Sequence, residues 1–269
     1  QPSVLAKQIA FSYDDAPMPD SPAMSGQART DLLLRELKNA GVKDALFFVT
    51  TKHIVDESSK KRIEKIIANG FHIAHHSHAH ESANQLSVED YLQDFDQADA
   101  VLNNFDNYLK LHRFPFLHHG KTASDQQQLR QALEERGFKD GYVTVDNAEG
   151  YLNHLYVQAI KEGQAVNMDA LKQLYIETMM AGIEYYDTLA VSTLKRSPSH
   201  VLLMHANDIS AIFAGDLARA LTEAGWEIIS PKLAYQDPIA NITPKTHYLK
   251  QGRVAALAHD AGAPESDLK

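Results

Sequence analysis

Short apolar runs alternate with amphipathic helical patterns along almost the whole chain, and this alternation constrains the fold more than any other feature. The run at residues 45–49, ALFFV, is continuous and apolar, which is typical of a strand buried on both faces. The helical pattern at residues 30–40 stops at Gly41, a residue that favours a helix end. Strands that alternate with helices predict a parallel sheet with helical crossovers. We expect strands at residues 7–13, 45–49, 71–74, 141–145, 200–204 and 226–229, and helices at residues 30–40, 59–69, 87–110, 123–136, 152–194 and 210–224.

The chain length of 269 residues suits one α/β domain with a large core. We expect a single domain over residues 1–258. Residues 259–269 are rich in Ala, Gly, Pro and acidic side chains, which predicts a flexible acidic tail. Residues 152–194 are longer than one crossover needs, so they predict a mostly helical insertion over one face of the domain.

Charge and composition exclude several kinds of partner and site. The 26 basic and 35 acidic residues give a net charge of −9, which argues against nucleic acids and anionic membranes as partners. Because the chain has no cysteine and 14 histidines, a transition-metal site must use imidazole and carboxylate ligands. No apolar run reaches the roughly 18 residues of a membrane span. The start at Gln1 rather than Met favours an exported protein whose signal peptide has been removed.

Titratable side chains directly follow several of the apolar runs. Parallel strands direct their carboxyl ends to one face of a barrel or doubly wound sheet, so these side chains are expected to lie close together. A helix cap or a turn residue is the alternative for each of them taken alone. They are Asp14, Asp15, His76, His80, Asp146 and His205.

His76 and His80 belong to the segment HSHAH, which follows a predicted strand. A spacing of four places two imidazoles on one face of a helical turn or on one side of a tight loop. With Asp15 they form a set of two histidines and one carboxylate that leaves a position open for water. We expect one divalent metal ion here, zinc in the first place, with cobalt or nickel as alternatives. A surface histidine cluster is the alternative for the spacing alone.

Asp14, Arg113 and His205 are the candidates for acid–base chemistry. Adjacent side chains of an extended chain point in opposite directions, so Asp15 can bind a metal while Asp14 reaches toward the bound water. An Asx turn is the alternative for this pair. Arg113 can pair with a catalytic carboxylate and keep it ionised, or form a surface salt bridge. His205 suits a general acid, with a satisfied core histidine as the alternative.

Taken together and in order, these segments resemble the polysaccharide deacetylase family, the NodB-homology domain of carbohydrate esterases. Ser12-Tyr13-Asp14-Asp15-Ala16 resembles the first motif of that family, Thr-Phe-Asp-Asp-Gly, and His76-Ser77-His78-Ala79-His80 matches the second, His-Ser/Thr-x-x-His. Arg113-Phe114-Pro115-Phe116 resembles the third, Arg-x-Pro-Tyr, and Leu203-Met204-His205 resembles the fifth, Leu-x-His. The motifs span residues 12–205, and the likeness extends to about residue 230.

The resemblance implies a distorted (β/α)7 barrel, similar to a TIM barrel, and a deacetylase that depends on a divalent metal. It implies metal ligation by Asp15, His76 and His80. It also implies that Asp14 is the general base, that Arg113 orients Asp14, and that His205 is the general acid.

The chain departs from the family pattern at the fourth motif, which normally carries an Asp near a Trp. Residues 145–151 read VDNAEGY and contain no Trp. Asp146 is our first choice for the carboxylate that tunes His205, and Glu149 is the alternative. Ala16 replaces the usual Gly, and His75 stands where Asn is common. These changes indicate a divergent member with an altered substrate.

The expected reaction is the removal of acetyl groups from an N-acetylated or O-acetylated carbohydrate. In it, a backbone N–H at Phe116 or Leu117 stabilises the oxyanion, together with the metal. A related metal-dependent amidohydrolase acting on a small non-sugar amide or imide is the alternative, which the missing Trp and the insertion favour. A catalytically silent metal- or glycan-binding protein is a lesser alternative. The oligomeric state stays open.

Overall fold

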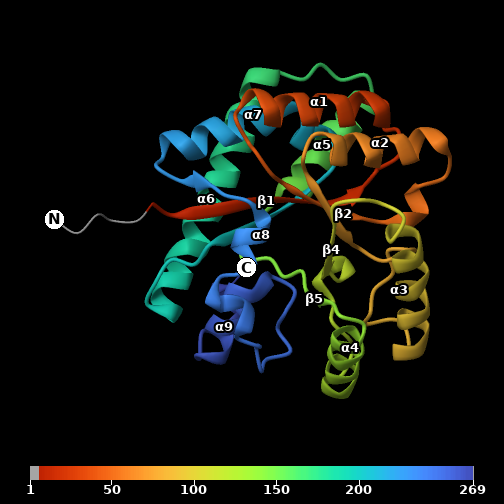
Figure 1. Cartoon of the computed structure of the whole chain (residues 1–269). Helices are drawn as coiled ribbons and strands as arrows, with labels where there is room; N and C mark the ends of the chain where they lie inside the picture. Colours follow the sequence, from red (N-terminus) through yellow and green to blue (C-terminus); the bar gives the residue numbers. More distant parts are fainter. Residues whose placement is uncertain (1–5, 269) are drawn as a thin grey trace.

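The computed structural model describes residues 6–268, so Gln1, on which the expectation of export rests, lies outside the described residues, as does Lys269. The chain forms one sheet of seven parallel strands surrounded by helices (Figure 1). The hydrogen-bonded order is β5-β4-β3-β2-β1-β6, and β7 also pairs with β1. The strands are β1 (Gln8–Ala16), β2 (Leu46–Val49), β3 (His72–His75), β4 (Tyr108–His112), β5 (Lys139–Asp140), β6 (His200–His205) and β7 (Glu227–Ile228).

The segment that follows β5 brings the two ends of this strand order together. The Gly141 N–H donates to the carbonyl of His112 in β4 (2.7 Å), and Val145 forms a parallel bridge with Leu202 of β6. The sheet therefore closes into a distorted barrel, and the predicted fold class is confirmed. Residues 141–145 are an irregular link rather than the continuous strand that the sequence predicts.

Helices follow most of the strands, and side-chain caps fix where several of them begin. Ser87 accepts the N–H of Asp90, and capping boxes start the helices after Asp56 and Thr122. The helices are α1 (Gly26–Asn39), α2 (Glu57–Ala68), α3 (Val88–Leu102), α4 (Ala123–Glu135), α5 (Glu149–Lys161), α6 (Met168–Leu194), α7 (Asp208–Glu223), α8 (Pro231–Ala234) and α9 (Gly252–Asp260). Single 3₁₀ turns lie at Thr51–His53, Pro115–Leu117, Pro238–Asn241 and Glu265–Asp267.

Helices α5 and α6 make up the insertion, as the sequence predicts. Both pack against α7, and α6 also packs against α9 (Figure 1). Tyr175, Met179 and Ile183 of α6 are fully buried in the main core. Helix α5 begins just after the bridge at Val145, so the insertion starts beside the rim formed by the carboxyl ends of the strands. Within residues 6–268, no helix is long and apolar enough to cross a membrane.

The helix predicted over residues 87–110 is wrong in its second half. Helix α3 ends at Leu102, and the chain re-enters the sheet as β4 from Tyr108. Asn107 has a φ of 53°, which interrupts right-handed helix, and its side-chain amide donates to the Phe71 carbonyl (3.1 Å). A strand of five residues is too short for its period to be told from that of the preceding helix.

The flexible tail predicted over residues 259–269 is wrong for the residues that the structure describes. Helix α9 runs to Asp260, and Leu268 is fully buried in the main core. The hydroxyl of Tyr185 in α6 donates to the carbonyl of Asp267. The domain therefore extends to residue 268, because its last residues cover the insertion.

The register of the sheet places polar residues from distant parts of the sequence side by side. Asp14 of β1 is the register partner of His205 of β6, and His75 of β3 is the partner of His112 of β4. These residues stand at or near the carboxyl ends of their strands, so the predicted site residues share one rim of the barrel.

A buried ion pair links this rim to the helical layer. Arg29 of α1 and Asp208 of α7 are 2.7 Å apart, and each side chain is only 2% exposed. Arg29 also donates to the carbonyls of Met18 and Pro19 in the loop after β1. We expect Asp208→Ala to lower the free energy of unfolding by about 3–5 kcal/mol in urea denaturation, because it leaves a buried guanidinium without its counter-charge.

The matched control lies on the same helix. Asp216→Ala removes an ion pair with Arg219 whose side chains are both substantially exposed. Such pairs contribute about 0–1 kcal/mol, so this variant should unfold almost like the wild type. Equal losses in the two variants would show that burial of the Arg29–Asp208 pair does not matter to stability.

Candidate active site

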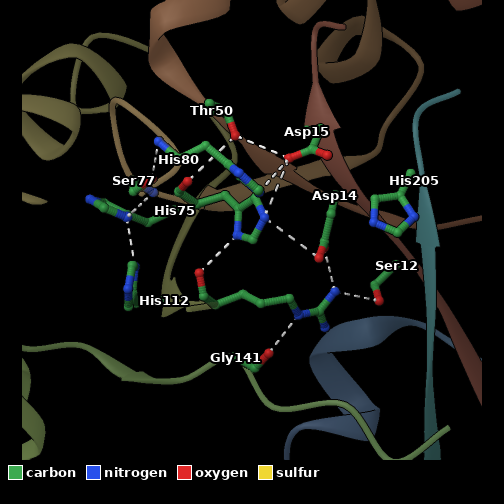
Figure 2. A network of polar contacts seen from close by, with 12 residues as sticks. Ser12, Asp14, Asp15, Thr50, His75, Ser77, His80, His112, Gly141 and His205 are labelled. Carbon is green, nitrogen blue, oxygen red and sulfur yellow. Dashed lines mark hydrogen bonds and ion pairs between the residues drawn. The ribbon is translucent and has the colours of Figure 1, made fainter. Parts of the chain in front are cut away.

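Asp15, His76 and His80 converge on one point of the rim. Figure 2 shows Asp15 beside His80. The Asp15 Oδ1 atom lies 3.1 Å from His80 Nε2 and 3.5 Å from His76 Nε2. The three ligand atoms all lie within 4.8 Å of one another. A tetrahedral zinc site with bonds of about 2.1 Å has ligand atoms about 3.4 Å apart, so this donor set fits a divalent ion of that kind.

The backbone is bent sharply to aim these side chains. Asp15, Ser77 and His80 all have positive φ, at 69°, 68° and 57°. Such residues persist only where the surroundings hold them, and they cluster at functional sites. The Ser77 Oγ atom accepts the N–H of His80 (2.9 Å). His76 Nδ1–H donates to the Arg113 carbonyl (2.8 Å), which leaves the Nε2 lone pair free to face Asp15.

The protonation states suit metal binding. Burial lowers the pKa of His76, so the imidazole stays neutral, as a ligand must be. Burial alone would raise the pKa of Asp15, but the hydrogen bond with His80 and the imidazoles that surround the carboxylate bring that pKa well below its usual range. The cluster therefore offers one ionised carboxylate together with imidazole nitrogens.

Arg113 and Asp14 form a buried pair beside this cluster. Arg113 Nη1 donates to Asp14 Oδ1 at 2.6 Å, and the arginine side chain is fully buried. Asp14 Oδ2 lies 3.6 Å from His76 Nε2, which brings the carboxylate to the edge of the metal-binding cluster. The structure thus places Arg113 where it can orient Asp14, as the family resemblance implies.

His205 is held by Glu149 rather than by Asp146, and our first choice for this carboxylate is wrong. Glu149 Oε2 lies 2.8 Å from His205 Nδ1, and Glu149 Oε1 accepts the Ser210 hydroxyl at 2.5 Å. The Asp146 carboxylate instead accepts the N–H of Asn147 (2.8 Å). Glu149 reaches back to His205 because it stands in the first turn of α5, directly above the strand ends.

The charge on Glu149 changes the acidity of His205. Burial alone would lower the pKa of the imidazole, but Glu149, Asp15 and Asp14 raise it to about 10. His205 is therefore protonated at neutral pH and loses its proton only as the pH rises toward that value. A third of the His205 side chain is exposed, so it can reach a substrate.

The turn after β4 carries the two candidate oxyanion donors. The Leu117 N–H already donates to the Phe114 carbonyl (3.0 Å), so that amide is engaged within the turn. Phe116 is then the stronger candidate of the two. Both residues have positive φ, and the Phe116 ring is 57% exposed with its centroid 4.8 Å from that of His80.

Some groups at the site escaped the sequence analysis. Thr50 follows β2 and its hydroxyl lies 3.4 Å from Asp15 Oδ1, so the rule that found the other strand-end residues could have found it. Tyr235 contacts Arg113 from a segment 122 residues away, and no motif marks it. The backbone carbonyl of Gly141 accepts the Arg113 Nε–H, and a backbone acceptor leaves no signal in the sequence.

Replacing Glu149 distinguishes it from Asp146 as the partner of His205. We expect Glu149→Gln to lower the pKa of His205 from about 10 toward the ordinary value of about 6.5, because the variant removes the nearest negative charge. The measurement is an NMR titration of the imidazole in metal-free protein. Asp146→Asn is the control and should shift the pKa much less. A larger shift in Asp146→Asn would restore our original assignment.

Comparison with known proteins connects this geometry to a family. A family model described as polysaccharide deacetylase matches residues 2–139, slightly more than half of the chain. The matched region includes Asp14, the three clustered ligand residues and Arg113. No curated protein matches the sequence.

Several solved structures share the fold. The polysaccharide deacetylase Bc1974 from Bacillus cereus is 21% identical with a TM-score of 0.59, covering 83% of this chain and 91% of that chain. The chitin deacetylase from Colletotrichum lindemuthianum is 18% identical with a TM-score of 0.59, at 86% and 88% coverage. The peptidoglycan deacetylase PdaC from Bacillus subtilis is 19% identical with a TM-score of 0.58, at 86% and 91% coverage. Because the family model matches more than half of the chain, the chain belongs to the polysaccharide deacetylase family.

Proposed function

We propose that the chain is a metal-dependent hydrolase that removes acetyl groups from an N-acetylated or O-acetylated carbohydrate. One observation carries the proposal: the cluster of Asp15, His76 and His80 lies beside an arginine-held carboxylate, Asp14, whose register partner is a carboxylate-held histidine, His205. Hydrolysis of an amide needs both a base and an acid. Asp14 supplies the base and His205 the acid, beside the cluster that would hold the metal.

Each group has a defined part in this mechanism. A divalent ion bound by the three ligands would supply an acidified water and polarise the acetyl carbonyl. Asp14 accepts the proton of the attacking water while Arg113 keeps the carboxylate in place. The Phe116 N–H donates to the carbonyl oxygen as negative charge develops there. His205, which the charge of Glu149 keeps protonated, donates its proton to the departing amine or alcohol.

The surroundings of the cluster favour an extended substrate. The side chains of Asp15 and His80 are 17% and 20% exposed, and the exposed Phe116 ring stands beside them as a flat apolar wall. A cavity of about 620 Å³ borders the site at Arg113 and Leu117 but is lined by none of the three clustered residues. The partial exposure of Asp15 and His80 beside the exposed Phe116 supports a substrate that approaches the cluster from solvent.

A small-molecule amidohydrolase remains the second candidate because of one observation. The single Trp of the chain, Trp226, is buried against His200 at the start of β6, so it forms no part of the rim. A purely metal-storing protein explains the histidines, but it does not explain why Asp14 and His205 each have a dedicated charged partner.

Acetate release tests the proposed function directly. We expect the zinc-loaded protein to release acetate from N-acetylglucosamine oligomers or O-acetylated xylan, and to lose this activity when a chelator removes the metal. Zinc or cobalt should restore it, with one ion held per chain. Turnover confined to small amides or imides would favour the amidohydrolase. Several weakly held ions and no turnover would favour the metal-storing protein.

Asp14→Asn tests the assignment of the base. The variant should bind zinc as the wild type does and lose about 10²–10⁴-fold in kcat, because Asn cannot accept the proton although its oxygen still accepts the Arg113 N–H. Asp44→Asn is the control, since Asp44 also contacts a histidine, His72, but at the start of β3. Near-normal turnover in Asp14→Asn would mean that another group is the base.

A further inference from the structure

Two buried histidines lie just behind the candidate active site and have no part in the proposed reaction. His75 is the last residue of β3 and His112 is the last residue of β4; the two are register partners and both are 0% exposed. Their rings contact Phe95 of α3, whereas the next residues in each strand, His76 and Arg113, face the site. The alternation of side chains along a strand explains this arrangement.

The hydrogen bonds of these histidines allow only one arrangement of protons. His75 Nε2 lies 3.0 Å from the Phe95 carbonyl, which only accepts, so Nε2 carries the proton. His75 Nδ1 accepts the N–H of Ser77 (3.1 Å) and must be unprotonated. His112 Nδ1, at 2.7 Å from that atom, is then the donor, and His112 Nε2 accepts the Tyr91 hydroxyl (2.8 Å). Burial lowers the pKa of both imidazoles, in agreement with two neutral rings.

This pair is connected to the metal-binding cluster by two short routes, of which the first, from His75 through Ser77 to His80, can be followed in Figure 2. His75 holds the N–H of Ser77, the residue with a φ of 68° whose hydroxyl in turn accepts the N–H of His80. His112 is followed by Arg113, whose carbonyl accepts the proton of His76 Nδ1. Each ligand histidine is therefore oriented by a backbone or side-chain group adjacent to one member of the pair.

We propose that His75 and His112 are positioning residues, and that the hydrogen bond between their Nδ1 atoms holds the turn of Ser77 and the carbonyl of Arg113 in the geometry that the metal ligands need. The inference rests on the proposed function, because it takes the cluster to bind a divalent ion. Its effect is on metal affinity first and on turnover only through the metal. Groups that orient metal ligands typically change affinity by about 10–100-fold when they are removed.

A pair of substitutions at residue 112 separates this hydrogen bond from simple packing. His112→Leu fills the site but removes the donor, whereas His112→Asn keeps a side-chain N–H near the position of Nδ1. We expect His112→Leu to weaken zinc affinity by about 10–100-fold, as measured by competition with a chromophoric chelator, and His112→Asn to stay within about threefold of the wild type. The visible spectrum of cobalt-substituted protein should change only in His112→Leu.

His72→Asn is the matched control, because His72 is a histidine of the same strand that contacts a carboxylate, Asp44, away from the turn. It should leave zinc affinity unchanged. Equal affinities in His112→Leu and the wild type overturn the inference, and so do equal losses in His112→Leu and His112→Asn, which would assign the effect to packing. A wild-type protein that binds no zinc overturns the proposed function as well.

The proton arrangement can also be tested in the unmodified protein, which covers the case in which His112→Leu does not fold. Nitrogen-15 NMR of the imidazoles should show His75 protonated at Nε2 and His112 protonated at Nδ1, in the presence and absence of zinc. Finding His112 protonated at Nε2 overturns the inference, since its Nδ1 could then no longer donate to His75.

Discussion

The buried guanidinium of Arg113 is the interaction on which the rest of the site depends. The guanidinium lies 3.8 Å from the centre of the Phe48 ring. All five of its N–H groups donate hydrogen bonds to residues of β1, of the segment that closes the barrel and of the turn after α8. They are Ser12, Asp14, Gly141, Tyr142 and Tyr235. Burying a charge is costly unless it is paired and fully hydrogen-bonded, so the surrounding chain has little freedom to shift. The position of Asp14 is a consequence of this arrangement.

Two histidines of the proposed reaction, His76 and His205, lie in environments that move their pKa values in opposite directions. Burial lowers the pKa of His76, whose Nδ1–H donates to a backbone carbonyl, while the charge of Glu149 raises that of His205 to about 10. A metal ligand must be neutral and a general acid must be protonated, so one barrel rim provides both states at the same pH. Both histidines stand at or just beyond the end of a parallel strand. The opposite pKa shifts therefore come from the surroundings of each ring and not from its position along the strand.

Much of this could be predicted from the sequence because strand periodicity and strand ends are local signals. The alternation of apolar runs and helical patterns predicts a parallel sheet with helical crossovers, the family resemblance implies the barrel, and the strand-end rule places Asp14, His76 and His205 on one rim. The choice between Asp146 and Glu149 could not be made, because both acids lie within one turn of the same strand end and only the start of α5 decides which one reaches His205. The contact between His75 and His112 could not be predicted either, since the sequence shows neither the register of β3 with β4 nor the existence of β4 as a separate strand.

The position of Glu149 changes how the insertion should be understood. Glu149 lies in the first turn of α5, and its second oxygen is held by Ser210 of α7, so the first helix of the insertion carries the group that raises the pKa of His205. The carboxylate is 1% exposed, and burying a carboxylate is costly unless its oxygens are paired and hydrogen-bonded, as they are here by His205 and Ser210. The start of the insertion is therefore fixed at the rim by the contacts of Glu149 with His205 and Ser210. The helix that lengthens the crossover therefore also carries the carboxylate that holds His205.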